Sequence, residues 1–312
     1  MDMNTPEMPR YNATPKAILE AHKPTGEKPM ELFITDEHTE HYLALQTGGD
    51  SYRGLMTGLL GGVGGGAGIG LGLFTLMQSG EAEGFYIMLS ICAPLFVVPF
   101  LWEILRPLPL PVLFNRRTRE VYFDHEGELF HAAWDGISAV AKEFQLVGPH
   151  FGGMQSASLE IHVYSFEKRD MALMVSLGSP LGKSLEMQKS LWEYIRSYMN
   201  NGPYFDENGN HSESDAFVKS QLSVRPRMSD SFKQTLESIN HAKQEMGGKN
   251  FLRGIDVLSL VLDLCFYPVC RIQELTYNLA KRRSRNLWPK VVTERLKANG
   301  PTTRLVDIER CQ

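Results

Sequence analysis

The stretch "GLLGGVGGGAGIGLG", residues 58–72, decides how the first half of the chain is organised. It lies inside a run of 23 residues, Leu55–Met77, that contains no charged side chain. A helix of this length spans about 34 Å at a rise of ~1.5 Å per residue, and the hydrocarbon core of a bilayer takes about 20 residues. The run therefore predicts a membrane-spanning helix, and the alternative is a buried helix in a soluble core.

A second apolar run, Phe85–Leu105, follows after the loop "QSGEAEG". Its one charged residue is Glu103, which lies close to its end. Pro94 and Pro99 predict kinks, which neighbouring helices in a membrane can accommodate. Together the two runs predict a transmembrane helical hairpin.

The charges around these runs predict the orientation of the hairpin. The loop has two glutamates and no Lys or Arg, whereas arginines flank the outer ends of the two runs. Because positive residues favour the cytoplasmic side, we expect a two-span protein with both termini in the cytoplasm. In a bacterium the loop would face the periplasm. Tryptophan is enriched at the same boundary because its ring is amphipathic. The residues expected at the membrane interface are Arg53, Trp102, Arg106, Arg116 and Arg117.

The glycine-rich stretch fits neither a nucleotide-binding loop nor a flexible linker. The two phosphate-binding patterns are GxGxxG and GxxxxGK, and the stretch completes neither of them. Flexible linkers interleave glycine with polar residues, whereas Leu, Val, Ile and Phe fill the gaps here. We therefore expect no cofactor and no small-molecule substrate at this stretch.

Glycines recur every four residues, which places them on one face of a helix. A face without side chains lets a second helix approach closely, and van der Waals packing drives helix association in lipid. The partner is left open: it is the second span, another copy of the chain, or a helix of a foreign protein. Glycines on the other faces favour more than one neighbour. The expected helix-packing residues are Gly54, Gly58, Gly62, Gly66 and Gly70.

Beyond Arg106 the pattern changes to short apolar pieces separated by turns. "NRRTRE" and "DHEGE" are typical of hairpin turns, and "SLEIHVYSF" alternates as a half-buried strand does. An amphipathic helix is expected over 181–199, with an apolar face formed by Leu185, Leu191, Trp192, Ile195 and Met199. Several short strands closed by one helix is the element order of a pleckstrin-homology-like (PH-like) barrel or sandwich.

Residues 105–200 also resemble the bacterial PH-like domains that follow a membrane hairpin, through "FNRRTREVYF" and "WDGISAV". With the two spans, they resemble a family of proteobacterial two-span membrane proteins that are often encoded beside type VI secretion effectors. "RRSRNLWPKVV" (282–292) is similar to the C-terminal end of that family. The resemblance implies an immunity or accessory role in the inner membrane, and it supplies no catalytic residue.

The C-terminal region contains an apolar segment and a basic cluster. Residues 251–270 are apolar but carry three charged residues, which is too many for a third span. We expect this segment to pack on the PH-like module or to lie in the membrane interface. The basic cluster is either solvated or contacts anionic lipid headgroups or a protein partner. Its residues are Arg282, Arg283, Arg285 and Trp288.

The sequence therefore predicts an α+β membrane protein in five segments. They are a polar cytoplasmic segment (1–51), a transmembrane hairpin (52–105), a PH-like β domain with its C-terminal helix (106–202), a loop (203–228) and a helical C-terminal region (229–312).

The sequence shows no catalytic or metal-ligand set, so we expect no enzyme, metal or cofactor. A formal net charge of −4 disfavours nucleic acid as a partner. The expected partners are the lipid bilayer and a protein. We expect an inner-membrane immunity protein that binds and neutralises a membrane-acting secretion-system toxin. The alternative is a homo-oligomeric membrane scaffold or sensor whose PH-like domain recruits a partner.

Overall fold

The computed structural model describes residues 14–48, 53–80, 82–148, 152–168, 170–180, 182–223, 231–245, 254–284 and 287–311. The chain divides into two compact units. The sheet unit comprises Met1–Ser51, Pro109–Arg225 and Leu287–Gln312. The helical unit comprises Tyr52–Leu108 and Pro226–Asn286. The predicted α+β class is confirmed.

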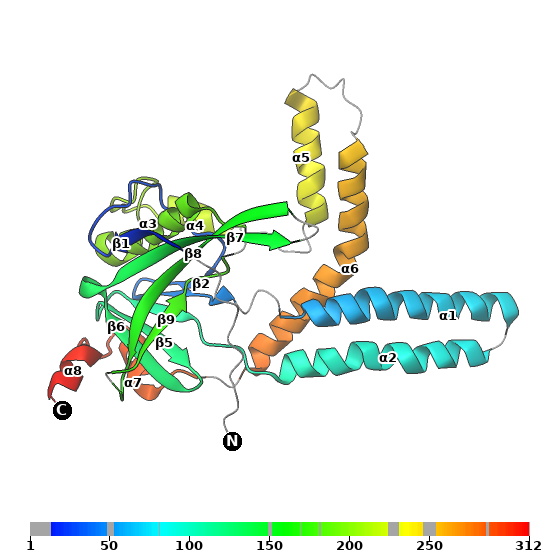
Figure 1. Ribbon diagram of the computed structural model, residues 1–312, viewed down its shortest axis with the longest axis horizontal. Helices are drawn as coiled ribbons and strands as arrows, with labels where there is room; N and C mark the ends of the chain where they lie inside the picture. The colour runs from blue at the N-terminus through cyan, green and yellow to red at the C-terminus, as the bar shows by residue number, and fades with distance from the viewer. Residues whose placement is uncertain are drawn as a thin grey trace. The chain divides into compact units, whose positions relative to one another are not determined.

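The sheet unit is built on nine antiparallel strands that form a curled sheet, half of a barrel (Figure 1). The strand order is β1-β7-β8-β6-β5-β4-β3-β2, and β9 pairs with β8 outside this path. The strands are β1 (Thr14–Glu20), β2 (Thr35–His38), β3 (Tyr42–Leu45), β4 (Val112–Asn115), β5 (Glu120–His125), β6 (Glu128–Ala133), β7 (Ser138–Gly148), β8 (Gly152–Ser165) and β9 (Ala172–Ser176).

Local sequence patterns located six of these strands. The "NRRTRE" turn joins β4 to β5, and the "DHEGE" turn joins β5 to β6, as predicted. Strands β1, β2 and β3 were missed, because they come from the stretch 1–51 that was expected as a separate polar segment. Strands β2 and β3 have four residues each, too few to show a convincing alternation. Strand β3 pairs with β4, and β2 pairs with β3 at the edge of the sheet.

Helix α3 (Leu185–Asn201) packs against β7 and β8, and it supplies much of the main core. Its first turn is capped by the Ser184 side chain, which accepts a hydrogen bond from the Met187 N–H at 3.2 Å. The predicted apolar face is confirmed, since Leu191, Trp192, Ile195 and Met199 are fully buried and Leu185 packs against the same core. The Trp192 ring lies 5.3 Å from that of Trp134, which is buried as well.

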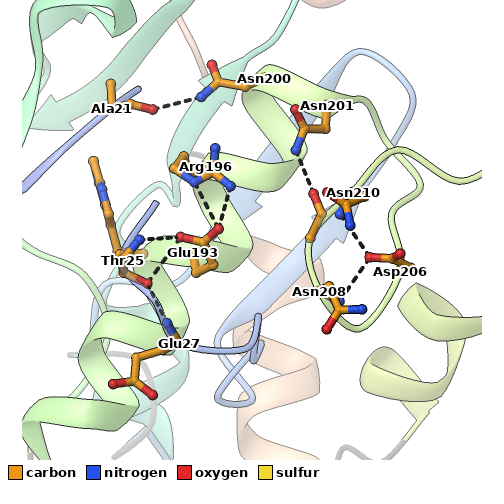
Figure 2. A network of polar contacts seen from close by, with 12 residues as sticks. Ala21, Thr25, Glu27, Glu193, Arg196, Asn200, Asn201, Asp206, Asn208 and Asn210 are labelled. Carbon is orange, nitrogen blue, oxygen red and sulfur yellow. Dashed lines mark hydrogen bonds and ion pairs between the residues drawn. The ribbon is translucent and has the colours of Figure 1, made fainter. Parts of the chain in front are cut away.

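A polar network ties the chain before β2 to α3 (Figure 2). The buried Glu193 carboxylate accepts hydrogen bonds from the Thr25 N–H at 2.9 Å and from the Arg196 Nε at 2.9 Å. One turn later, Asn200 donates to the carbonyl oxygen of Ala21 at 2.7 Å. Because Arg196 is only 8% exposed, its charge depends on Glu193 for compensation.

Three shorter helices complete the sheet unit: α4 (Ala216–Ser223), α7 (Lys290–Leu296) and α8 (Leu305–Cys311). Val292 and Leu305, from α7 and α8, join a second, smaller core with Leu113 and Tyr122 of the sheet. The C-terminal region 229–312, expected as one helical segment, is therefore shared between the two units.

The helical unit begins with a π-helix, η2 (Thr57–Gly65), which continues directly as α1 (Gly66–Ser79). Helix α2 (Ala82–Leu105) packs along both of them (Figure 1). We call η2–α1 and α2 the apolar helix pair. Helices α5 (Ser231–Glu245) and α6 (Gly254–Arg283) pack on each other, and α6 also contacts η2 and α2.

Two helices are long and apolar enough to cross a membrane, Thr57–Gln78 with 22 residues and Ala82–Leu105 with 24. Only 17% and 6% of their most apolar stretches are buried within the chain. A core helix of a soluble protein would be mostly covered, because apolar surface left in water is unfavourable. The low burial therefore favours the predicted bilayer environment over the buried-helix alternative.

The network in Figure 2 gives a prediction about stability. Glu193→Ala leaves the Arg196 guanidinium buried without a carboxylate, so we expect the free energy of unfolding to fall by about 3 kcal/mol. The double variant Glu193→Leu/Arg196→Met removes both charges and should lose clearly less. Urea unfolding of the full chain in detergent, followed by tryptophan fluorescence, measures both. A double variant as unstable as Glu193→Ala would contradict this role of the ion pair.

Candidate functional site

We call the glycines that recur every four residues between Gly54 and Gly72 the glycine ladder. One face of this ladder packs against α6. A Cβ atom at Gly54 would lie 2.6 Å from the carbonyl oxygen of Gln273, and one at Gly58 would lie 2.8 Å from the carbonyl oxygen of Val269. At Gly62, the nearest atom would be Cδ1 of Ile272 at 3.1 Å. These glycines let the backbones of η2 and α6 approach more closely than any side chain would permit. Gly54 also has a φ of +84°, which favours glycine.

A second glycine face packs against α2. A Cβ atom at Gly61 would overlap the Phe96 ring, and one at Gly68 would overlap the Cys92 sulfur. At Gly72 the nearest atom would be the Cβ of Met88 at 3.1 Å. The sequence favoured more than one neighbour for the glycine helix, and the structure places two of them within the same chain.

A third group of glycines has no neighbour. Cβ atoms at Gly64, Gly66 and Gly70 would meet no atom of the described residues within 4 Å. Of the five expected packing residues, Gly54, Gly58 and Gly62 therefore contact α6, whereas Gly66 and Gly70 face open space. The ladder divides at the point where η2 becomes α1.

A buried carboxylate joins the two apolar helices at one end. Glu103 of α2 is 3% exposed and accepts hydrogen bonds from the N–H of Gly54 at 3.0 Å and the N–H of Thr57 at 3.1 Å. The Thr57 hydroxyl donates to the same carboxylate at 2.5 Å. These donors include N–H groups at the start of the helix, which have no intrahelical partner and favour a negative charge. From the sequence, Glu103 was identified only as the single charged residue of its apolar run. A lone charge in such a run is the sequence signal that could have predicted this buried contact.

Three of the residues expected at the membrane interface lie at this same end. Arg53 donates to the carbonyl oxygens of Glu103 at 3.0 Å and Pro107 at 2.9 Å. The Arg106 guanidinium lies 5.5 Å from the centre of the Trp102 ring, which is half exposed. Cations and tryptophan therefore gather beside Glu103, as they do at the headgroup level of membrane proteins.

Arg116 and Arg117 lie in the sheet unit and hold backbone carbonyls. Arg116 donates twice to the carbonyl oxygen of Glu40, at 3.2 and 3.0 Å. Arg117 donates to the carbonyl oxygens of Lys297 and Gly300, the latter at 2.9 Å. Both guanidinium groups thus stabilise the sheet unit, and their contact with a membrane stays a prediction.

The expected lipid or partner contacts are distributed over both units. Arg282 and Arg283 are exposed at the C-terminal end of α6, and Arg285 lies outside the described residues. Trp288 is partly buried against the second core of the sheet unit. Its ring therefore has a structural role, and the proposed contact of this cluster with lipid stays a prediction.

The sheet unit contains a cavity of about 510 Å³ that sequence reasoning missed. Its polar lining comes from β6, β7, β8 and α8, through His131, Ser138, His162, Tyr164 and Glu309. This volume lies in the range of pockets that hold small ligands. Its lining residues are far apart in the sequence, so no local motif announces it.

His131 lies at the floor of this cavity between two carboxylates. Its Nε2 lies 2.9 Å from Oε1 of Glu309, and its Nδ1 lies 3.9 Å from Oε1 of Glu120. Among the described residues, the buried Nδ1 has no hydrogen-bond partner. Glu120 in turn accepts hydrogen bonds from the Tyr122 hydroxyl at 2.8 Å and the Val306 N–H at 3.2 Å, so it also anchors the start of α8.

Within the described part of the chain, no three His, Cys, Asp or Glu side chains come together as a metal-ligand set. His38 of β2 lies against the rings of Tyr194 and Tyr198. Its Nε2 lies 2.7 Å from the carbonyl oxygen of Pro203, and burial lowers its pKa. It is a packed residue of the sheet unit.

Comparisons of the chain with protein-family models, curated proteins and solved structures found no match. The class defined by fold and site is therefore an α+β protein that joins a half-barrel sheet to two helices long and apolar enough to cross a membrane.

The divided ladder predicts a difference between two identical substitutions. Gly58→Leu forces η2 away from Val269, so we expect the unfolding temperature of the full chain in detergent to drop by roughly 2–12 °C, as for an overpacked site that loses 1–3 kcal/mol. Gly70→Leu places the same side chain in open space and should leave it unchanged. Equal effects at the two positions would contradict the packing of η2 on α6. Limited proteolysis within α6, which should accelerate only in Gly58→Leu, gives a second measurement.

The pKa of Glu120 predicts a dependence of stability on pH. Burial raises the pKa of its carboxyl above the ordinary value of 4.5, although hydrogen bonds from Tyr122 and Val306 oppose the shift. Between the ordinary and the raised pKa, the folded chain binds more protons than the unfolded chain, so the free energy of unfolding falls as pH rises.

Glu120→Gln removes this titration. We expect its free energy of unfolding, from urea unfolding, to fall less steeply than that of the wild type as the pH rises above 4.5. Glu167→Gln makes the same change at an exposed carboxyl and serves as the control. A Glu120→Gln variant that keeps the slope of the wild type would contradict the raised pKa.

Proposed function

We propose that this chain is a two-span protein of a bacterial inner membrane, with both termini in the cytoplasm and a PH-like module in the sheet unit. The observation that carries the proposal is the exposure of the apolar helix pair. Only 17% and 6% of its most apolar stretches are buried within the chain. Arg53, Trp102 and Arg106 at one end of the pair supply the cationic and aromatic belt of a membrane boundary. The curled sheet with α3 packed on it supports the PH-like assignment.

We further propose that the protein is an immunity protein that binds and neutralises a membrane-acting secretion-system toxin. Two faces of the glycine helix are already occupied by α2 and α6. A third face, with Gly66, Gly70, Phe74 and Met77, remains open; Phe74 is 61% and Met77 88% exposed. Apolar side chains beside glycines suit a contact with a foreign transmembrane helix. The family resemblance of the spans, the module and the C-terminal end supports the same role.

A second candidate is a membrane scaffold or sensor that forms oligomers and recruits a partner through the sheet unit. The cavity with His131, His162 and Tyr164 favours it, because a sensor needs a site that changes its occupancy. In this case, the open glycine face would contact another copy of the chain.

Co-expression with the toxin encoded by the adjacent gene tests the immunity role. We expect cells with the wild type to survive, and cells with Gly66→Leu/Gly70→Leu to lose at least about tenfold in viable count, because leucines block close helix approach. Gly64→Leu makes the same change in open space on another face and should still protect. Immunoblots of the membrane fraction check that all variants reach the same level.

The outcomes separate the two candidates. Equal death with and without the wild type contradicts the immunity role. If Gly66→Leu/Gly70→Leu still protects but loses chemical cross-linking to a second copy, the glycine face serves self-association, as the scaffold candidate requires.

A further inference from the structure

In the first half of α6, apolar side chains are exposed and polar side chains are partly buried, which is the distribution of a helix in lipid rather than in water. Its apolar side chains point outward, and six of them are 45–64% exposed: Val257, Leu258, Val261, Leu262, Leu264 and Phe266. At 3.6 residues per turn they cover an arc of about 200°. A contiguous apolar surface of this kind marks contact with a membrane or another protein.

The polar residues of the same half lie on the narrow remaining side. Asp256, Ser259 and Asp263 fall within about 60° of one another around the helix, and each is partly buried. Asp263 accepts a hydrogen bond from the Thr235 hydroxyl of α5 at 2.6 Å. Helix α6 therefore turns Asp263 toward α5 and its exposed leucines outward, which reverses the arrangement of a helix on a soluble protein.

The place where α6 meets the apolar helix pair indicates what surrounds the exposed apolar residues of Val257–Phe266, which we call the apolar arc. Beyond Pro268, α6 crosses η2 through Val269 and Ile272, at the end of the apolar helix pair where Arg53, Trp102 and Glu103 lie. Its first half then runs at a steep inclination to α1 and α2 (Figure 1). The first half of α6 therefore leaves the apolar helix pair at the end that carries these cationic and aromatic residues.

We propose that the first half of α6 lies in the bilayer along its cytoplasmic surface, with this apolar arc against the acyl chains. The inference rests on the proposed crossing of the bilayer by the apolar helix pair. An in-plane amphipathic helix buries its apolar face at the boundary of headgroups and acyl chains. Arg282 and Arg283, exposed at the C-terminal end of α6, add attraction to anionic headgroups. Thr235 of α5 holds Asp263 by a hydrogen bond, on the side of the helix away from the apolar arc.

Site-specific quenching in vesicles tests this arrangement. The full chain is reconstituted in phosphatidylethanolamine–phosphatidylglycerol vesicles, with Cys265, Cys270 and Cys311 replaced by Ala and the buried Cys92 kept. Bimane is attached to a single new cysteine, and doxyl groups on the acyl chains quench it. Leu264→Cys reports on the apolar arc, and Leu71→Cys, in α1, reports on the span. Lys233→Cys, on an exposed position of α5, is the control outside the arc.

We expect the doxyl lipids to lower the emission at positions 264 and 71 by at least about twofold and to leave position 233 nearly unchanged. Quenching at 71 without quenching at 264 overturns the inference and keeps the two-span anchor. If 264 is unquenched but its emission is blue-shifted, a protein surface covers the arc, and the inference again fails. Loss of quenching at both positions overturns the anchor together with the inference.

Discussion

The close backbone contact between η2 and α6 is the constraint on which the helical unit depends. Gly54, Gly58 and Gly62 leave no side chain between the two helices, and any Cβ atom at the first two would overlap the backbone of α6. At the Gly54 end, α2 is joined to the start of η2 by Glu103. Its buried carboxylate accepts hydrogen bonds from the N–H groups of Gly54 and Thr57. The absence of side chains at these glycines thus fixes the positions of η2, α2 and α6 relative to one another.

The two units of the chain follow opposite rules of burial. In the sheet unit the largest fully buried side chains are aromatic, among them Trp134 and Trp192, whose rings lie 5.3 Å apart. In the helical unit, the polar side chains of Glu103 and Asp263 turn toward other helices, and leucines and valines turn outward. With the helical unit in lipid, as we propose, the same physical principle explains both units, because each unit buries the groups that its surroundings do not solvate.

Prediction from the sequence succeeded where the signal was local. The hairpins around "NRRTRE" and "DHEGE" and the apolar face of α3 follow from turn residues and periodicity within a few residues. It failed for β1, β2 and β3. Strand β1 pairs with β7 and β3 pairs with β4, both far away in the sequence, and the polar β2 pairs with β3. The cavity at His131 was missed for the same reason, since β6, β8 and α8 meet there only after folding.

The sequence by itself determined the lengths of the two apolar helices, the four-residue repeat of glycine and the strands joined by the turns "NRRTRE" and "DHEGE". These features follow from residues that are neighbours in the chain. Only the tertiary structure decided which helix covers which glycine. It assigned Gly54, Gly58 and Gly62 to α6, left Gly66 and Gly70 without a contact from the described residues, and turned Asp263 of α6 toward α5. A side-chain-free face permits many partners equally, so the selection among them depends on contacts between residues that are distant in the chain.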